Sequence, residues 1–124
     1  MKKYAKFFVR FVFGAAVVIC FNSCLTTTTK YNWYSYQENS YDYLKKSNDA
    51  SVNRLLKTYK KMIDAPTGTR ACVPPGVCAD YGWILVQKGF VPEGLEMLRN
   101  EIKFYPESEK FISQIIGRIE YGEN

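Results

Sequence analysis

Large apolar side chains recur every three or four residues from about residue 32 onward, which is the spacing of helices with one buried face. The first run, in which a small serine takes one position, predicts a helix and comprises Trp33, Tyr36, Ser40, Tyr43 and Leu44. Ser47-Asn48-Asp49 then supplies a turn and an N-cap, because short polar side chains accept hydrogen bonds from the free N–H groups at a helix start. The second run predicts a helix that Pro66-Thr67-Gly68 ends, and it comprises Val52, Leu55, Leu56, Tyr59 and Ile63.

Further helices follow the same spacing. The third is expected from about Gly76 to Lys88, with a buried face formed by Val77, Cys78, Tyr81, Ile84 and Leu85. Gly89 suits the left-handed residue that ends a helix, and Pro92-Glu93 begins the next one, which stops at Tyr105-Pro106. The last helix begins near Glu107-Ser108, stops at Gly122 and carries Phe111, Ile112, Ile115, Ile116 and Ile119. The pattern predicts an all-α fold, a small bundle of about five antiparallel helices.

Within this pattern, the stretch from Pro75 to Pro106 resembles one tetratricopeptide repeat, a hairpin of two helices. Gly82 and Gly94 stand at the small positions of its two helices, with Gly89 in the turn. A glycine inside a helix costs about 1 kcal/mol relative to alanine, so Gly82 is best justified if another backbone approaches it closely. The sequence departs from the repeat at Cys78, where tryptophan is frequent, and at Glu101, where alanine is usual.

The N-terminus has the pattern of an export signal. Residues 7 to 21 form a run that is almost entirely apolar. Lys2, Lys3 and Lys6 precede this run and Arg10 lies within it, with no acidic residue among them. A membrane-spanning helix needs roughly 20 apolar residues, so this run is too short unless Arg10 is tolerated inside it. The sequence predicts a signal peptide over residues 1–23.

The signal ends in Phe21-Asn22-Ser23-Cys24, which resembles the lipobox of bacterial lipoproteins. Ser23 has the small size needed before the cut, whereas Ile19 before the rival Cys20 is bulky. Lipidation of Cys24 is therefore expected, and the alternative is an ordinary signal or a membrane anchor whose cysteine is incidental. Several acyl chains hold a protein on a membrane far more firmly than one.

Residues 24–31 are expected to form the lipidated cysteine and a short tether, and residues 32–124 the helical domain. A six-residue tether reaches roughly 20 Å, which keeps the domain near the membrane. Leu25, rather than an acid, follows the modified cysteine. This favours the outer membrane, with the protein facing the periplasm of the cell envelope.

Composition excludes several function classes. The chain carries 17 basic and 12 acidic residues, a net charge of +5, but the signal accounts for four of the basic residues and no acid. The rest is close to neutral and has no basic stripe interleaved with aromatics, which disfavours nucleic-acid binding. There is no histidine, the commonest general base and transition-metal ligand. No catalytic residue, metal or cofactor is predicted.

Two further cysteines, Cys72 and Cys78, flank Val73-Pro74-Pro75-Gly76-Val77. An exported protein meets conditions in which disulfides persist, and this spacing can close across a proline turn. Alternatively, Cys78 packs in a helix interface as a small free thiol.

The chain as a whole resembles a bacterial lipoprotein family described as domain of unknown function 4810. The segments that carry the resemblance are Tyr31-Asn32-Trp33-Tyr34-Ser35-Tyr36, Tyr41-Asp42-Tyr43-Leu44-Lys45, Val73-Pro74-Pro75-Gly76, Asp80-Tyr81-Gly82 and Phe104-Tyr105-Pro106-Glu107-Ser108. The family often has glycine after the tryptophan, where this chain has Tyr34, and Cys72 and Cys78 look peculiar to this member. The resemblance implies an envelope lipoprotein, encoded beside other lipoproteins of which one resembles the curli secretion channel. It implies no reaction.

The function predicted from these features is a membrane-anchored helical module that binds other envelope lipoproteins. Expected contact residues are the aromatic Trp33, Tyr36, Tyr81 and Trp83, with Arg70 and Arg99 as polar anchors. Trp83 lies off the buried face of its helix and is expected to be exposed. One alternative is a structural role in which the tyrosine-rich segment lies on lipid headgroups. Another is a cell-wall-active enzyme, which would need paired carboxylates or an activated nucleophile in a cleft. The acidic Glu93, Glu96 and Glu101 lie on a short amphipathic helix, where charge usually marks a solvated face.

Overall fold

The computed structural model describes residues 28–122, so the signal peptide and Cys24 lie outside the described residues. Within this part the chain forms α-helices and a single 3₁₀ turn, η1, and no strands. Their bounds are α2 Tyr36–Lys46, α3 Asp49–Asp64, α4 Val77–Gln87, α5 Val91–Phe104, η1 Pro106–Ser108 and α6 Glu109–Tyr121. The predicted all-α fold with about five helices is confirmed.

Local chemistry sets most of these boundaries. The Asn48 side chain accepts a hydrogen bond from the Ser51 backbone N–H at 2.8 Å, and Ser51 reciprocates, so the predicted N-cap begins α3. Gly89, with φ +88°, separates α4 from α5, as predicted. The first helix begins later than the apolar spacing suggests, at Tyr36, because Tyr34 has φ +46° and breaks the helical path after Trp33.

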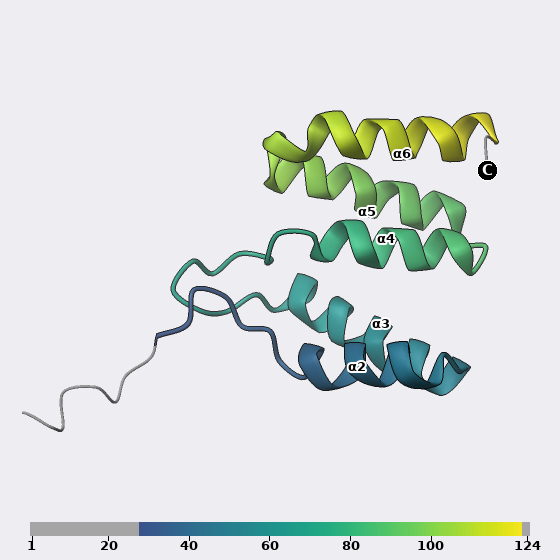
Figure 1. Cartoon of the computed structure of the whole chain (residues 1–124). Coiled ribbons are helices and arrows are strands. Elements are labelled where there is room, and N and C mark those ends of the chain that lie inside the picture. The colour runs from purple at the N-terminus through teal and green to yellow at the C-terminus, as the bar shows by residue number, and fades with distance from the viewer. Residues whose placement is uncertain (1–27, 123–124) are drawn as a thin grey trace, which may run out of the picture.

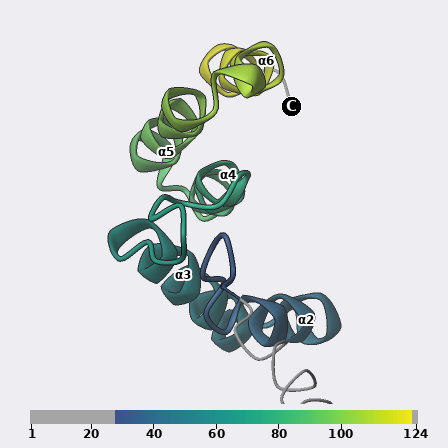
Figure 2. The same cartoon turned by 90° about the vertical axis from the view of Figure 1, so that its left-hand side faces the viewer.

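The helices follow one another in a curved row, each packed on the next (Figure 2). In this view α2, α4 and α6 lie on the inner side of the curve, and α3 and α5 lie on the outer side. Figure 1 looks onto the inner side and shows α4 and α6 running in the same direction, with α5 antiparallel to both. This arrangement leaves one concave face that helices from three parts of the chain share.

Two small cores hold the row together. The larger one lies between α3, α4 and the loop before α4, and comprises Leu55, Tyr59, Met62, Val73, Val77, Cys78 and Ile84. Leu98 of α5 and Ile112 of α6 are buried further along the row. Of the face predicted for α4, Tyr81 and Leu85 are only half-buried, because they line a shallow groove against α3 and α5.

The hairpin of α4 and α5 is the most extensively packed helix pair. Its two backbones meet at small residues: a Cβ placed on Gly82 would lie 2.6 Å from the carbonyl oxygen of Gly94. The expected close approach at Gly82 is therefore present. Among residues 28–122, no helix combines the length and apolar character that crossing a bilayer requires.

Candidate interaction surfaces

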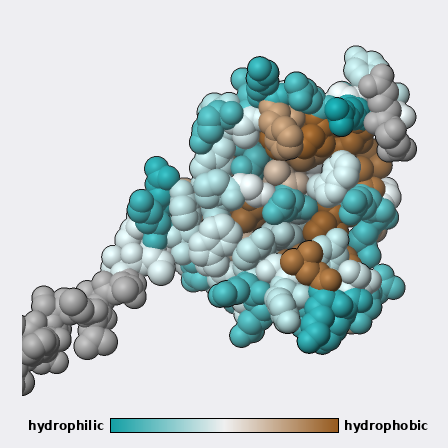
Figure 3. Space-filling model, viewed as in Figure 1, coloured by the Kyte–Doolittle hydropathy of each residue, from teal (hydrophilic) through white to brown (hydrophobic). Residues whose placement is uncertain are grey.

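The concave face contains a groove between α4 and α6 with a volume of about 780 Å³. Trp83 and Val86 of α4 form one wall, and Phe111, Ile115 and Ile119 of α6 form the other. In Figure 3, apolar surface gathers in this region between α4 and α6. Such a groove suits an apolar partner surface, because single soluble domains rarely leave a large apolar patch uncovered.

A second, smaller groove of about 250 Å³ lies between α2 and α4. Tyr36, Tyr43 and Leu44 of α2 line it. Asp80 and Trp83 of α4 line both this groove and the one between α4 and α6. Trp83 has 46% of its surface exposed, which confirms its predicted exposure, and it stands on the ridge between the two grooves. These two grooves and this ridge are called the concave surface below.

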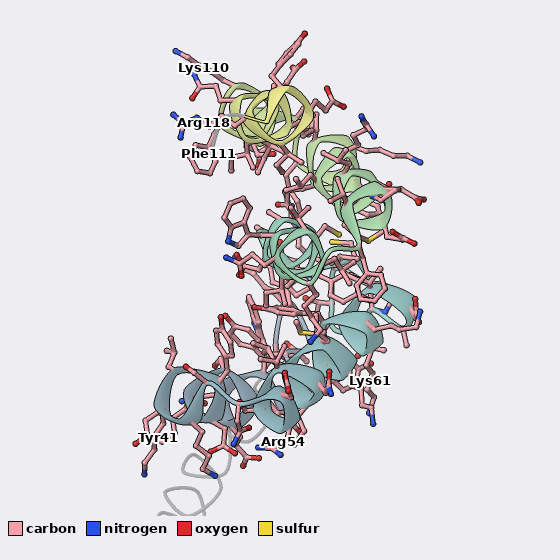
Figure 4. The ribbon with its side chains drawn as sticks, turned by 90° about the vertical axis from the view of Figure 1, so that its right-hand side faces the viewer. Tyr41, Arg54, Lys61, Lys110, Phe111 and Arg118 are labelled. Atoms are coloured by element: carbon pink, nitrogen blue, oxygen red, sulfur yellow. The ribbon has the colours of Figure 1, made fainter. Side chains whose placement is uncertain are left out.

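The α6 wall of the concave surface exists because this helix has more apolar residues than its neighbour can cover. Ile112 is buried, but Phe111, one residue earlier, is 66% exposed. Figure 4 shows Phe111 and Arg118 projecting from α6 toward the concave side. Arg118 forms no ion pair within the described part of the chain. The wall therefore offers an apolar strip beside an available cation.

The opposite wall offers an acid. The Asp80 carboxylate accepts a hydrogen bond from the Tyr59 hydroxyl at 3.4 Å. Partial burial raises the pKa of Asp80, while the hydrogen bond opposes that shift, and burial together with the Asp80 charge raises the pKa of Tyr59. The Tyr59 hydroxyl therefore stays protonated as the donor. The groove carries an acidic residue, Asp80, on α4 and a cationic residue, Arg118, on α6.

A row of aromatic rings leads from the N-terminal segment into the core. Neighbouring ring centroids are separated by 6.5 Å for Tyr31 and Trp33, 5.4 Å for Trp33 and Tyr36, and 5.7 Å for Tyr36 and Tyr59. Tyr81 continues the row beyond Tyr59, at 6.3 Å. The row includes the exposed Trp33 near its start and passes through the buried Tyr59, so it links the surface at Trp33 to the interior.

The predicted contact residues divide between different faces. Tyr36 and Trp83 share the smaller groove, and Trp33 stacks on Tyr36 beside it. Tyr81 instead lines the shallow groove on the other side of α4, with Lys60, Ile63 and Met97. Of the four predicted aromatic contact residues, the structure thus places Tyr36 and Trp83 on the concave surface and Trp33 beside it.

The two predicted polar anchors make internal contacts. The Arg70 guanidinium donates a hydrogen bond to the Tyr31 hydroxyl at 2.8 Å, which raises the pKa of Arg70. Arg99 of α5 forms a 2.6 Å ion pair with Glu120 of α6. Neither arginine lines the concave surface, because α5 lies on the outer side of the curve and Arg70 lies in the α3–α4 loop. Their role in binding a partner stays a prediction.

Cys72 and Cys78 are both free thiols in the structure. Cys78 is fully buried in the core of α3 and α4, whereas Cys72 is half-buried and its sulfur lies 4.0 Å from the Tyr105 hydroxyl. Burial, and then the negative charge of Glu101, raise the pKa of Cys78 to about 12. The position of Cys78 matches the alternative of a thiol packed in a helix interface.

Sequence reasoning missed two groups of residues. Phe111, Ile115 and Ile119 were named only as apolar residues that the last helix carries, although an apolar arc that wide on a terminal helix signals an uncovered surface. Glu101 was noted as a departure from a repeat and was expected, with Glu93 and Glu96, on a solvated helix face, which is wrong for Glu101. In the structure its carboxylate is buried and accepts a hydrogen bond from the Gly76 backbone N–H at 2.7 Å.

A family model described as Domain of unknown function (DUF4810) matches residues 30–115, which is more than half of the chain. Neither the curated proteins nor the solved structures contain a match to this chain.

Proposed function

The chain belongs to the DUF4810 family, and from this premise we propose that it is a lipid-anchored protein of the cell envelope whose concave surface binds a segment of a partner protein. The family description names no activity, so the proposal rests on the N-terminal sequence and on the geometry of the concave surface.

The N-terminal sequence supports the anchor. Basic residues precede a short apolar run that ends at Ser23-Cys24, as in bacterial lipoproteins. In the proposal Cys24 carries the acyl chains, and the domain is held at the outer membrane and faces the periplasm. An acylated Cys24 is expected to give a purified protein that is heavier by its lipid and remains with the envelope, and Cys24→Ala is expected to abolish both properties.

One observation carries the binding role: Trp83 is exposed on a ridge between two grooves, and the larger groove has an uncovered apolar wall on α6. Tryptophans in such settings often supply much of an interface's binding energy. The larger groove is open along two helices, so it suits an amphipathic helix that lays its apolar face between α4 and α6.

The charges indicate what the partner segment carries. A basic side chain would meet Asp80 on one wall, and an acidic side chain would meet Arg118 on the other. The partner in this proposal is another envelope lipoprotein, as the family resemblance implies, and the role is assembly rather than catalysis. The chain has no histidine. Apart from Asp80, the carboxylates within residues 28–122 are exposed or are engaged in ion pairs or hydrogen bonds inside the domain.

The test is site-specific photocrosslinking of the full-length lipidated protein in cells. A photoreactive amino acid replaces Phe111 or Trp83 in the concave surface, and Lys57 on the exposed side of α3 as the matched control. The expected result is one discrete product from positions 111 and 83, identified by mass spectrometry as an envelope lipoprotein, and none from position 57. Equal labelling from all three positions would contradict a specific concave surface.

A pair of substitutions then separates binding from folding. Trp83→Ala is expected to keep the helical circular dichroism spectrum and weaken capture of the crosslinked partner. Tyr121→Ala removes an aromatic ring that is more exposed than Trp83 and lies outside both grooves, and it is expected to change neither. If Trp83→Ala unfolds the protein, Trp83 belongs to the core and the proposed surface is wrong.

A further inference from the structure

The segment that leads to Cys24 is fixed to the folded domain at a definite place. The Thr69 and Arg70 backbone N–H groups donate hydrogen bonds to the Thr29 and Lys30 carbonyl oxygens, each at 3.1 Å. A Cβ on Gly68 would lie 2.7 Å from the Lys30 carbonyl oxygen, so the two chain segments are in direct backbone contact here, with no room for a side chain at residue 68. Figure 1 shows the first described residues beside the α3–α4 loop at one end of the domain.

This end of the domain must therefore stay close to an acylated Cys24. Only Leu25, Thr26 and Thr27 separate Cys24 from Thr28, the first described residue. Even a fully extended chain of that length spans only roughly 15 Å. If Cys24 is anchored in a bilayer, Thr28 cannot leave the headgroup region by more than that distance, and residues 29–34 and the adjoining loop at 65–72 are the parts of the domain next to it. The name tether-proximal surface is used below for these two segments with Lys61.

The tether-proximal surface carries cations without acidic partners. Lys30, Lys61 and Arg70 are exposed, and none of them forms an ion pair within residues 28–122. The nearest acid in sequence, Asp64, is bonded to Lys60 at 3.1 Å. The positive charge at this end is thus available to an anionic surface.

Aromatic rings contact two of these cations, Lys61 and Arg70. The Lys61 ammonium lies 4.4 Å from the centroid of the Tyr34 ring, and Arg70 donates its hydrogen bond to the Tyr31 hydroxyl. Beside them Trp33 is 42% exposed. Tyrosine and tryptophan are enriched at the membrane–water boundary, where an apolar ring and a polar tip are both satisfied.

We propose that the tether-proximal surface binds the headgroups of an anionic bilayer, so that the domain is held in one orientation with the concave surface left free for a protein. This inference rests on the proposed anchoring at Cys24, because the short tether keeps this surface close to the membrane. Lysine and arginine near an anionic membrane each strengthen binding by about fivefold. Three unpaired cations with interfacial aromatics therefore suffice to select one orientation of a protein that acyl chains already hold at the surface.

The chain contains two tryptophans, one on each of the two surfaces, which allows a direct test. Trp83→Phe leaves Trp33 as the only tryptophan, and Trp33→Phe leaves Trp83. The full-length lipidated variants are reconstituted in vesicles of phosphatidylcholine and phosphatidylglycerol that contain brominated phosphatidylcholine, a quencher confined to the bilayer. The expected result is strong quenching of Trp33 and little quenching of Trp83.

Charge substitutions test the chemistry of the contact. Lys61→Gln and Arg70→Gln are each expected to lower the ratio of membrane-docked to undocked domain, measured from the quenching of Trp33, by about fivefold. Lys110→Gln neutralises an exposed lysine of α6 outside the tether-proximal surface (Figure 4) and is expected to leave the ratio unchanged. Vesicles of phosphatidylcholine alone are expected to reduce the quenching of Trp33 as well.

The outcomes distinguish the anchor from the orientation. A protein that mass spectrometry shows to be acylated, but in which Trp33 is quenched no more than Trp83, overturns the orientation and leaves the anchor intact. A protein without acyl chains overturns the anchor. In that case, selective quenching of Trp33 on anionic vesicles would still support the lipid-binding surface, and its absence would overturn both.

Discussion

The carbonyl oxygens of Gly82 and Gly94 each occupy the space that a Cβ on the other residue would need, at 2.6 Å in both directions. The nearest obstacle at Gly82 is backbone, and at Gly94 the Cγ2 atom of the β-branched Val86 blocks the space together with the Gly82 backbone. A methyl group there can be accommodated only if α4 and α5 move apart along their whole interface. This pair of glycines therefore sets the spacing of the central hairpin.

Gly82→Ala is expected to destabilise the protein, although alanine favours a helix over glycine by about 1 kcal/mol. Overpacking of a fitted interface typically costs about 1–3 kcal/mol, and here that cost exceeds the gain in helix propensity. The measurement is urea unfolding of the purified protein, followed by circular dichroism. Gly117→Ala is the matched control, because Gly117 lies within α6 and a Cβ there meets nothing within 4 Å. It is expected to stabilise, and a stabilising Gly82→Ala would contradict the close packing.

Tyr34 has φ +46°, a backbone conformation that side chains other than glycine rarely adopt. It is held there because its hydroxyl donates a hydrogen bond to the Ala65 carbonyl oxygen and Lys61 lies over its ring. Glycine would adopt this conformation without the steric cost that a side chain brings. At Tyr34 the contacts of the side chain offset the cost of a backbone conformation that only glycine adopts freely.

Two substitutions at Tyr34 separate its strain from its contacts. Tyr34→Ala loses both contacts and keeps the strain, whereas Tyr34→Gly loses the contacts and relieves the strain. Since the left-handed conformation costs an L-residue about 1–2 kcal/mol and glycine loses about 0.5–1 kcal/mol in chain entropy, Tyr34→Gly is expected to be the more stable by about 1 kcal/mol. Urea unfolding measures the difference. Equal stabilities of the two variants would show that the backbone at residue 34 is not strained.

Features set by neighbouring residues could be predicted from the sequence, whereas features set by contacts between distant segments could mostly not. The cap at Asn48 and the break at Gly89 depend on residues next to one another in the chain, and both predictions are confirmed. The late start of α2 depends on Tyr34, whose positive φ is maintained by a distant contact with Ala65. The spacing of apolar residues puts Trp33 and Tyr36 on one helical face, but it carries no information about that contact.

The same distinction explains the candidate surface. Helical spacing shows that Tyr81 and Trp83 differ in direction, so the exposure of Trp83 was predictable. It does not show which side of the curved row each direction faces, since that depends on how α4 sits between α3, α5 and α6. Tyr81 consequently faces a different groove from Trp83, although both belong to one short helix.

The two free cysteines are expected to differ in reactivity. Burial and the charge of Glu101 raise the pKa of Cys78 to about 12, so at pH 8 almost none of it is the reactive thiolate, and reagents cannot reach it. Cys72 is half-buried in the loop before α4. Alkylation of the native protein without reductant is expected to label Cys72 alone, and Cys78 only after unfolding in urea. If neither reacts until a reductant is added, the two form a disulfide instead.

Glu101 supplies from α5 the cap that α4 lacks. Gly76, the residue before α4, has no side chain with which to accept a hydrogen bond, and no other side chain of α4 caps this end. The Glu101 carboxylate accepts from the Gly76 N–H at 2.7 Å and from the Ala79 N–H at 3.4 Å, and the residue is only 3% exposed. The positive end of the α4 dipole stabilises this buried charge. Glutamate at a position where the repeat has alanine thus joins the two helices of the hairpin.

Glu101→Ala is expected to lower the free energy of unfolding by about 2–3 kcal/mol, because it removes a buried carboxylate and leaves the half-buried Gly76 and Ala79 N–H groups without this acceptor. Glu101→Gln keeps an acceptor oxygen but not the charge, so its expected loss is nearer 1 kcal/mol. Glu96→Gln changes an exposed carboxylate of the same helix and is expected to shift stability by less than about 0.5 kcal/mol. Urea unfolding of the three variants gives the order. If Glu101→Gln destabilised as much as Glu101→Ala, the charge rather than the hydrogen bonds would hold the start of α4; if neither variant differed from Glu96→Gln, the proposed cap would be wrong.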